Sequence, residues 1–284
     1  MARILVAEHA GACYGVERAL DITRRTLDNA DGTVCTLGPL IHNPLVVEEL
    51  EARGARVVDA PEGVEPGATL VMRTHGVPPS VESRAREAGA LVVDATCPYV
   101  KKVHAHAERL ARAGYQVVVV GETGHPEVEG TVGHVLDALV IGSADEARSA
   151  AVGRRVGLVV QTTLARSVLH EVVDVLLDRC EELCVVDTIC KATRDRQLAA
   201  RELAGHVDVM VVVGGRNSAN TTHLFQICED ECPRTFYVES ASELRREWFC
   251  KASVVGVTAG ASTPAAHIES VVGEIDSLCD ACEP

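Results

Sequence analysis

The sequence predicts an α/β fold made of three pseudo-symmetric modules, each with a small parallel sheet. Short apolar runs alternate with helical periodicity along the whole chain, which is typical of βαβ units. At three well-separated places, Cys13, Cys97 and Cys190, a cysteine stands where an apolar run gives way to a helical stretch. This recurrence predicts modules of residues 1–97, 98–190 and 191–284, and the first strand could pair with another module.

The predicted elements follow one another in a regular order. The strands are residues 3–7, 34–37, 55–58, 69–72, 90–93, 116–121, 138–141, 155–160, 183–186, 207–213, 235–238 and 253–258. The clearest helices are residues 16–27, 44–52, 79–88, 100–113, 164–176, 193–204, 221–229 and 264–275. Ligands bind beyond the carboxyl ends of the strands in such sheets, so functional side chains are expected there.

The amino-acid composition and net charge exclude some classes of protein function. The 284 residues are 47% apolar, which allows a substantial core, and the net charge of −14 disfavours nucleic acid as a partner. No apolar run is long enough to span a bilayer or to form a signal peptide, so we expect a cytoplasmic protein. Eleven cysteines in such a chain indicate metal or cofactor ligation and buried thiols rather than a disulfide framework.

Cys13, Cys97 and Cys190 are candidate ligands of an iron–sulfur cluster. A helix N-terminus favours the thiolate, which is the form that binds metal. Three thiolates can hold a cluster and leave one iron without a protein ligand. Buried free thiols are the alternative. A structural zinc site also stays open for the closely spaced pairs Cys180 and Cys184, Cys228 and Cys232, and Cys279 and Cys282.

Polar residues at the predicted strand ends indicate a site for an anionic substrate. His42, His75 and His125 lie in loops near proline or glycine, where an imidazole can donate to a phosphate oxygen. Glu127 could donate a proton, and Thr162 could pass that proton on or hold a substrate hydroxyl. The alternative role for Glu127 is a first-turn carboxylate that faces the helix dipole.

Two further segments, residues 217–220 and 260–262, offer hydroxyl, amide and backbone N–H groups to an anion. The first segment follows Gly214 and Gly215 and opens a helix, but it lacks the Gly-Lys-Ser/Thr end of a P-loop. Each segment is a weak motif alone, and each falls at a predicted strand end.

Nine motifs in this order resemble the family of 4-hydroxy-3-methylbut-2-enyl diphosphate reductases, which complete the methylerythritol phosphate route to isoprenoids. They are Cys-x-Gly-Val-x-Arg-Ala at 13–19, Gly-Pro-Leu-Ile-His-Asn at 38–43, Arg-Thr-His-Gly-Val at 73–77, Asp-Ala-Thr-Cys-Pro at 94–98, Gly-His-Pro-Glu-Val-Glu-Gly-Thr at 124–131, Gln-Thr-Thr at 161–163, Thr-Ile-Cys at 188–190, Asn-Ser-x-Asn-Thr at 217–221 and Thr-Ala-Gly-Ala-Ser-Thr-Pro at 258–264.

The resemblance implies a trefoil of three α/β modules around a 4Fe–4S cluster that Cys13, Cys97 and Cys190 hold. It places His125, Glu127 and Thr162 around an allylic hydroxyl as the catalytic and substrate-side residues. The implied ligands of the diphosphate are His42, His75, Ser218, Asn220 and Ser262, and Thr193 matches a further threonine on the substrate side.

The implied reaction is the reductive dehydration of 4-hydroxy-3-methylbut-2-enyl diphosphate to isopentenyl and dimethylallyl diphosphate. The cluster would deliver two electrons, one at a time, while Glu127 and its relay protonate the departing oxygen. The implied partners are the small allylic diphosphate and a ferredoxin or flavodoxin as electron donor. Neither nucleic acid nor a membrane is implied.

Three positions depart from the family pattern. Ala12 stands where phenylalanine is usual, Ala219 where a second serine is usual, and Lys191 where a neutral residue is usual. Losing one hydrogen bond from a serine hydroxyl to a phosphate costs about 1.5–3 kcal/mol of binding free energy. A paralogue that reduces a related allylic substrate therefore stays open as an alternative function. A quinolinate-synthase-like lyase with a three-cysteine cluster and a non-enzymatic iron–sulfur sensor also stay open as functions.

Overall fold

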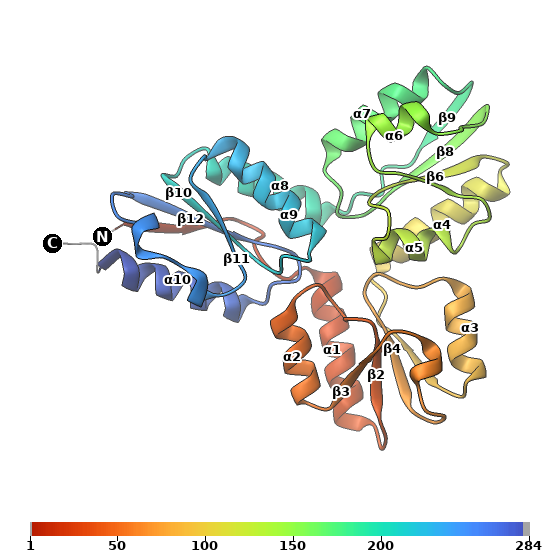
Figure 1. Cartoon of the computed structure of the whole chain (residues 1–284), viewed down its shortest axis with the longest axis horizontal. Helices are drawn as coiled ribbons and strands as arrows, with labels where there is room; N and C mark the ends of the chain where they lie inside the picture. The colour runs from red at the N-terminus through yellow and green to blue at the C-terminus, as the bar shows by residue number, and fades with distance from the viewer. Residues whose placement is uncertain (1, 281–284) are drawn as a thin grey trace. The chain divides into compact units, whose positions relative to one another are not determined.

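The computed structural model describes residues 2–280 and contains three four-stranded parallel sheets flanked by helices (Figure 1). The α/β class with small parallel sheets is therefore confirmed. The chain divides into two compact units. We call them the terminal unit, which comprises Met1–Tyr14, His42–Pro44 and Lys191–Pro284, and the central unit, which comprises Gly15–Ile41 and Leu45–Cys190.

The terminal unit contains one sheet with the strand order β1-β12-β10-β11. β1 (Arg3–Val6) pairs in parallel with β12 (Val254–Ala259), so the first strand joins a sheet built from the end of the chain. The other elements of this unit are β10 (Val209–Val213), β11 (Thr235–Val238), α8 (Lys191–Ala204), α9 (Ala219–Glu231), α10 (Ala265–Asp280) and two 3-10 helices, Ala241–Glu243 and Arg246–Trp248.

Both faces of this sheet are covered. Val211 of the inner strand β10 packs in one cluster with Val271 and Ile275 of α10, whereas its neighbour Val212 packs in another with Leu224 of α9. A strand that is buried on both faces needs apolar side chains at successive positions, which explains the unbroken valine run 211–213. Cys228 and Cys232 lie in the second cluster, and Cys279 lies in the first. Cys282 lies outside the described residues.

The central unit contains two sheets, with the strand orders β3-β2-β4-β5 and β7-β6-β8-β9. The first is formed by β2 (Val34–Leu37), β3 (Ala55–Val58), β4 (Thr69–Met72) and β5 (Leu91–Asp94), with α1 (Tyr14–Asn29), α2 (Pro44–Ala52), the 3-10 helix Pro61–Gly63 and α3 (Pro79–Glu87). The second is formed by β6 (Gln116–Val120), β7 (Leu139–Ile141), β8 (Arg155–Val160) and β9 (Glu182–Val185), with α4 (Pro98–Arg112), α5 (Pro126–Val132), α6 (Ala144–Ser149) and α7 (Arg166–Leu177).

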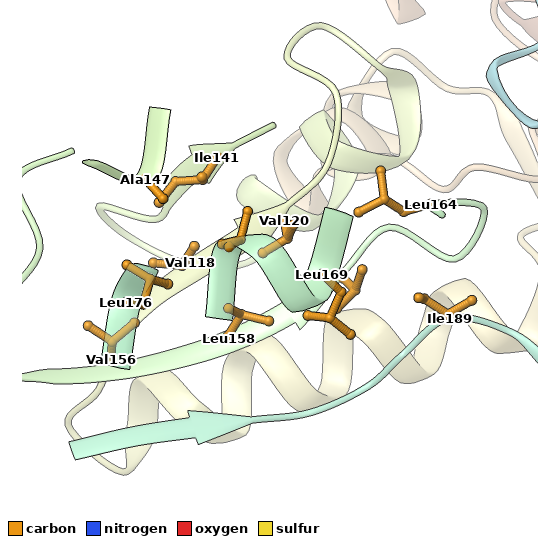
Figure 2. Packing of buried hydrophobic residues seen from close by; sticks show 12 residues of the cluster. Val118, Val120, Ile141, Ala147, Val156, Leu158, Leu164, Leu169, Leu176 and Ile189 are labelled. Atoms are coloured by element: carbon orange, nitrogen blue, oxygen red, sulfur yellow. The ribbon is translucent and has the colours of Figure 1, made fainter. Parts of the chain in front are cut away.

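Figure 2 shows the cluster that fills one face of the β7-β6-β8-β9 sheet. Val118 and Leu158 of the inner strands pack with Leu169 and Leu176 of α7, and all four side chains are at most 4% exposed. The predicted strands are all present with boundaries shifted by at most a few residues. The short helix α6 was not among the predicted helices, and α5 was expected only as the first turn in which Glu127 could lie. Within residues 2–280, no helix is both long and apolar enough to cross a membrane.

Candidate active site

The three predicted cysteines occupy equivalent positions, each within its own sheet. Each follows an edge strand (β1, β5 or β9) and directly precedes a helix (α1, α4 or α8). Each backbone N–H donates to a carbonyl of the loop after the neighbouring strand: Cys13 to Ala261 at 3.3 Å, Cys97 to Thr74 at 2.9 Å and Cys190 to Thr162 at 3.1 Å. All three side chains are partly exposed. The structure therefore confirms the predicted recurrence of a thiol between strand and helix.

An aspartate shapes the turn before two of these cysteines. Asp94 Oδ1 accepts the N–H of Thr96 at 2.9 Å, and Asp187 Oδ1 accepts the N–H of Ile189 at 3.1 Å. Each aspartate lies three residues before its cysteine, and in both sheets this side-chain-to-backbone turn lies between the strand and the cysteine. The sequence pattern Asp-x-x-Cys contained this signal.

The central unit buries an acid at the carboxyl end of its second sheet. Glu127, in the first turn of α5, is 2% exposed, and its carboxyl group accepts two hydrogen bonds from Thr162. The backbone N–H of Thr162 lies 2.6 Å from Oε1, and its hydroxyl lies 2.7 Å from Oε2. Burial raises the pKa of Glu127 to about 7, although both hydrogen bonds act in the opposite direction. The group can therefore hold a proton near neutral pH.

His125 is the N-cap of α5, with Pro126 at the first helical position. Its Nδ1 accepts the N–H of Glu127 at 3.1 Å. In the neutral ring, this bond leaves the proton on Nε2, so His125 presents a donor away from the helix.

His75 lies beside His125, with ring centroids 5.5 Å apart at an angle of 83°. The turn that carries His75 ends at Gly76, whose φ of +72° favours glycine. Gly130 of α5 also packs closely against this turn, and an added Cβ would lie 3.3 Å from the carbonyl oxygen of His75, which is a tight contact. Two glycines thus allow the close approach that places the two histidines together.

Gln161 holds the loop that carries Thr162. Its Oε1 accepts the N–H of Glu122 at 3.0 Å, and its Nε2 donates to the Thr163 hydroxyl at 3.0 Å. An added Cβ on Gly121 would lie 2.8 Å from Gln161 Oε1, so a glycine is needed there. Gln-Thr-Thr was identified as a motif in the sequence without a role for Gln161, because its partner Glu122 lies at the end of another strand.

The terminal unit brings together the remaining predicted polar residues in two groups. Ser218, the N-cap of α9, accepts the N–H of Thr221 at 3.3 Å and its hydroxyl at 3.0 Å. Asn220 is 7% exposed, and among the described residues its buried Nδ2 has no hydrogen-bond acceptor. An unpaired buried amide donor is costly unless a ligand supplies the acceptor.

The second group joins the loop after β12 to the segment 42–44. The Ser262 hydroxyl donates to the carbonyl of His42 at 3.1 Å, and the Asn43 amide donates to the carbonyl of Ser262 at 2.8 Å. Thr193, on α8 of the same unit, is 1% exposed. Asn43 was part of a predicted motif without a role of its own, and the structure shows that it fixes the Ser262 loop.

Arg196 supports the loop before Cys13. It is 3% exposed, and its Nη2 donates to the carbonyl of Gly11 at 2.7 Å. Gly11 has a φ of +92°, and an added Cβ would lie 2.7 Å from Ile268. No sequence pattern indicated this role for Arg196, since a charged residue on a helical stretch usually faces solvent.

A cavity of about 260 Å³ in the central unit is lined in part by Thr96, Lys101 and His104. His104 stacks on His134, with ring centroids 4.1 Å apart, and Nδ1 of His134 lies 2.9 Å from the Glu108 carboxylate. Burial, followed by the charge of His134, lowers the pKa of His104 to about 4. His104 is therefore a neutral, buried ring at pH 7.

A sequence model of the LytB protein family matches residues 4–276. The chain belongs to the LytB family. A protein of Aquifex aeolicus named 4-hydroxy-3-methylbut-2-enyl diphosphate reductase is 43% identical over an alignment of 284 positions, which covers 99% of this chain and 98% of that protein. A protein of Citrifermentans bemidjiense with the same name is 44% identical and covers 97% of this chain and 98% of its own length.

Solved structures agree with this membership of the LytB family. A structure of (E)-4-hydroxy-3-methyl-but-2-enyl diphosphate reductase, described as the terminal enzyme of the non-mevalonate pathway, is 43% identical with a TM-score of 0.74 and covers 98% of this chain and 100% of that chain. The Plasmodium falciparum reductase structure has a TM-score of 0.91 at 24% identity, over 96% of this chain and 87% of that chain, and shows the shared fold. LytB membership implies an iron–sulfur enzyme that acts on a small diphosphate.

Proposed function

We propose that this chain reduces 4-hydroxy-3-methylbut-2-enyl diphosphate to isopentenyl and dimethylallyl diphosphate. The observation that carries the proposal is the buried Glu127–Thr162 pair, an acid with a pKa of about 7 at the strand ends beside two loop histidines. Removing a hydroxyl as water needs such a proton donor. The reaction balances as one substrate, two electrons and two protons giving one product and one water.

We assign a 4Fe–4S cluster to Cys13, Cys97 and Cys190. Partly exposed thiols at helix starts suit this cofactor, because soft thiolate donors bind iron–sulfur clusters and a helix N-terminus favours the thiolate. When bound, the cluster supplies one-electron transfer and a Lewis-acidic iron. The backbone bonds that fix each cysteine loop keep the three thiols in defined positions within their own units.

Glu127 and its neighbours would control the proton. The protonated carboxyl group gives its proton to the departing hydroxyl, and the Thr162 hydroxyl orients that group through its 2.7 Å hydrogen bond. His125 contributes its Nε2 proton as a hydrogen-bond donor, since Nδ1 is engaged by Glu127 N–H. The burial of Glu127 and Thr162 excludes water from the transfer.

The diphosphate would be held by residues that can donate hydrogen bonds. Asn220 offers the buried amide that lacks a protein acceptor among the described residues, and Ser218 keeps its hydroxyl proton because its oxygen accepts from Thr221. The other proposed substrate ligands are His42, His75, Thr193 and Ser262. A ferredoxin or flavodoxin as electron donor and a cytoplasmic location stay predictions of the sequence.

The test is anaerobic turnover of 4-hydroxy-3-methylbut-2-enyl diphosphate with dithionite-reduced methyl viologen, on protein whose iron and sulfide are quantified. We expect both five-carbon diphosphates as products. A protein that binds no cluster would contradict the cofactor assignment. A loaded cluster without turnover would instead favour a related allylic substrate, and products formed without reductant would favour a lyase.

A further inference from the structure

We propose that the first two turns of α4, together with Arg18 of α1, form the docking surface for a small acidic protein that carries single electrons. The defining side chains of this α4 surface are Tyr99, Lys102 and Arg18. The inference rests on the proposed function, because it assumes that Cys97 holds the cluster that receives the electrons.

The distribution of lysine first indicates this surface. The chain has a net charge of −14, and it has lysine at four positions only: Lys101, Lys102, Lys191 and Lys251. Three of these positions closely follow a proposed cluster cysteine, either Cys97 or Cys190. Three of the four lysines therefore lie close in sequence to cysteines that are proposed to hold the cluster.

Helix α4 is basic as a whole. Its 15 residues include four basic side chains, Lys101, Lys102, Arg109 and Arg112, and one acidic side chain, Glu108. Cys97 is its N-cap, so the positive end of the helix dipole lies at the same place as the cysteine. Lys102 is five residues further on, about 7.5 Å along the helix axis.

The contacts show which of these charges are available. Lys101 forms an ion pair with Asp94, and Lys191 forms one with Asp195, so both charges are partly neutralised. Lys102 is exposed, and among the described residues no carboxylate pairs with it. Its ammonium instead lies 5.1 Å from the centre of the Tyr99 ring.

Arg18 and Tyr99 complete the surface. Arg18 Nη1 donates to the carbonyl of Thr96 at 3.3 Å, which places a second cation next to the Cys97 loop. Tyr99 is 39% exposed and lies two residues after Cys97. An exposed aromatic ring with cations beside it is a common composition for an interface centre with a charged rim.

The chemistry of this surface favours an acidic redox protein. Electron-transfer complexes are small and transient, and complementary charge raises their association rate. Nucleic acid would also meet positive charge here, but Lys102 and Arg18 are too few cations for the many phosphate contacts on which nucleic-acid binding depends. A small anion would not need the exposed tyrosine.

The test compares Lys102→Glu with the matched control Lys251→Glu. Lys251 is also an exposed lysine, and it lies outside the α4 surface. On cluster-loaded enzyme with a purified acidic ferredoxin at low ionic strength, we expect Lys102→Glu to lower kcat/KM for ferredoxin and its binding affinity about tenfold. Both losses should shrink in about 0.5 M salt, since screening weakens exposed charges, and Lys251→Glu should match the wild type.

A chemical donor separates this proposal from the proposed function. With dithionite-reduced methyl viologen, Lys102→Glu should retain wild-type turnover, because its defect concerns docking alone. Equal ferredoxin kinetics and affinity in the two variants would overturn the docking surface while leaving the reductase activity intact. If the wild type fails with the chemical donor, the proposed function fails, and ferredoxin binding still reports on the surface.

Discussion

The carboxyl group of Glu127 is held at both oxygens by Thr162, through the backbone N–H at 2.6 Å and the hydroxyl at 2.7 Å. These bonds favour the carboxylate, while burial favours the protonated acid, and burial has the larger effect. The result is an acid that is half protonated near pH 7 and whose carboxyl group has a fixed orientation.

Glu127→Gln should lower turnover about 10²- to 10⁴-fold, because the amide keeps the size of the side chain but cannot donate an acidic proton. Iron and sulfide content should stay at the wild-type level, since Glu127 is not a proposed ligand. Anaerobic steady-state kinetics with a chemical reductant measures the effect. Wild-type turnover in this variant would remove Glu127 from the mechanism.

Turnover should fall as pH rises above about 7, because Glu127 then loses the proton that it donates. Thr162→Val removes the hydroxyl bond that favours the carboxylate, so the pKa should rise and this limb of the pH profile should move to higher pH. Thr162→Ser keeps the hydroxyl and should keep the wild-type limb. An unchanged profile in Thr162→Val would show that another group sets it.

The free energy of unfolding should fall as pH drops from about 6.5 to about 4, owing to His104. Its folded pKa of about 4 lies below the ordinary value of 6.5, so the unfolded chain binds the proton first. Over this whole pH range, His104 should lower the free energy of unfolding by about 3 kcal/mol.

Urea denaturation across this pH range should show a flatter profile for His104→Asn than for the wild type. The slope is compared rather than the absolute stability, because the substitution also changes packing. The groups that face His104 are His134, Glu108, Asp94 and Lys101, and all four are unchanged in the variant. Parallel profiles would show that His104 takes up its proton equally in both states.

Gly76→Ala should lower the free energy of unfolding of the central unit for two reasons, the positive φ and a steric contact. The steric contact should cost about 1–3 kcal/mol in addition to the cost of the positive φ. The φ of +72° disfavours alanine, and the added Cβ would lie 2.7 Å from Cε1 of His104 and 3.2 Å from Thr96. Gly67→Ala is the matched control, since Gly67 has a φ of +84° but no atom of the described part of the chain lies within 4 Å of an added Cβ. Thermal unfolding should separate the two variants, and equal losses would show that the contact with His104 does not matter.

Local sequence patterns were sufficient to predict the strands and most helices. Valine runs such as 117–120 and 211–213 are buried on both faces of parallel sheets, so they are recognisable without knowledge of their neighbours. The helices α5 and α6 are only seven and six residues long, and too few turns are present for a clear helical period. The three cysteines at strand ends were also visible, because strand, cysteine and helix are adjacent in the chain.

The sequence by itself determined the α/β class, the recurrence of the cysteines and the family, since each depends on residues that are close together or on ordered motifs. Only the tertiary structure decided which strands are neighbours, for example that β1 pairs with β12. It also showed that Glu127 is buried against Thr162, that the Asn220 amide has no acceptor within residues 2–280, and that Gln161 and Arg196 support the loops. These relations join residues far apart in the chain, and burial and hydrogen-bond partners depend on three-dimensional neighbours that local patterns do not specify.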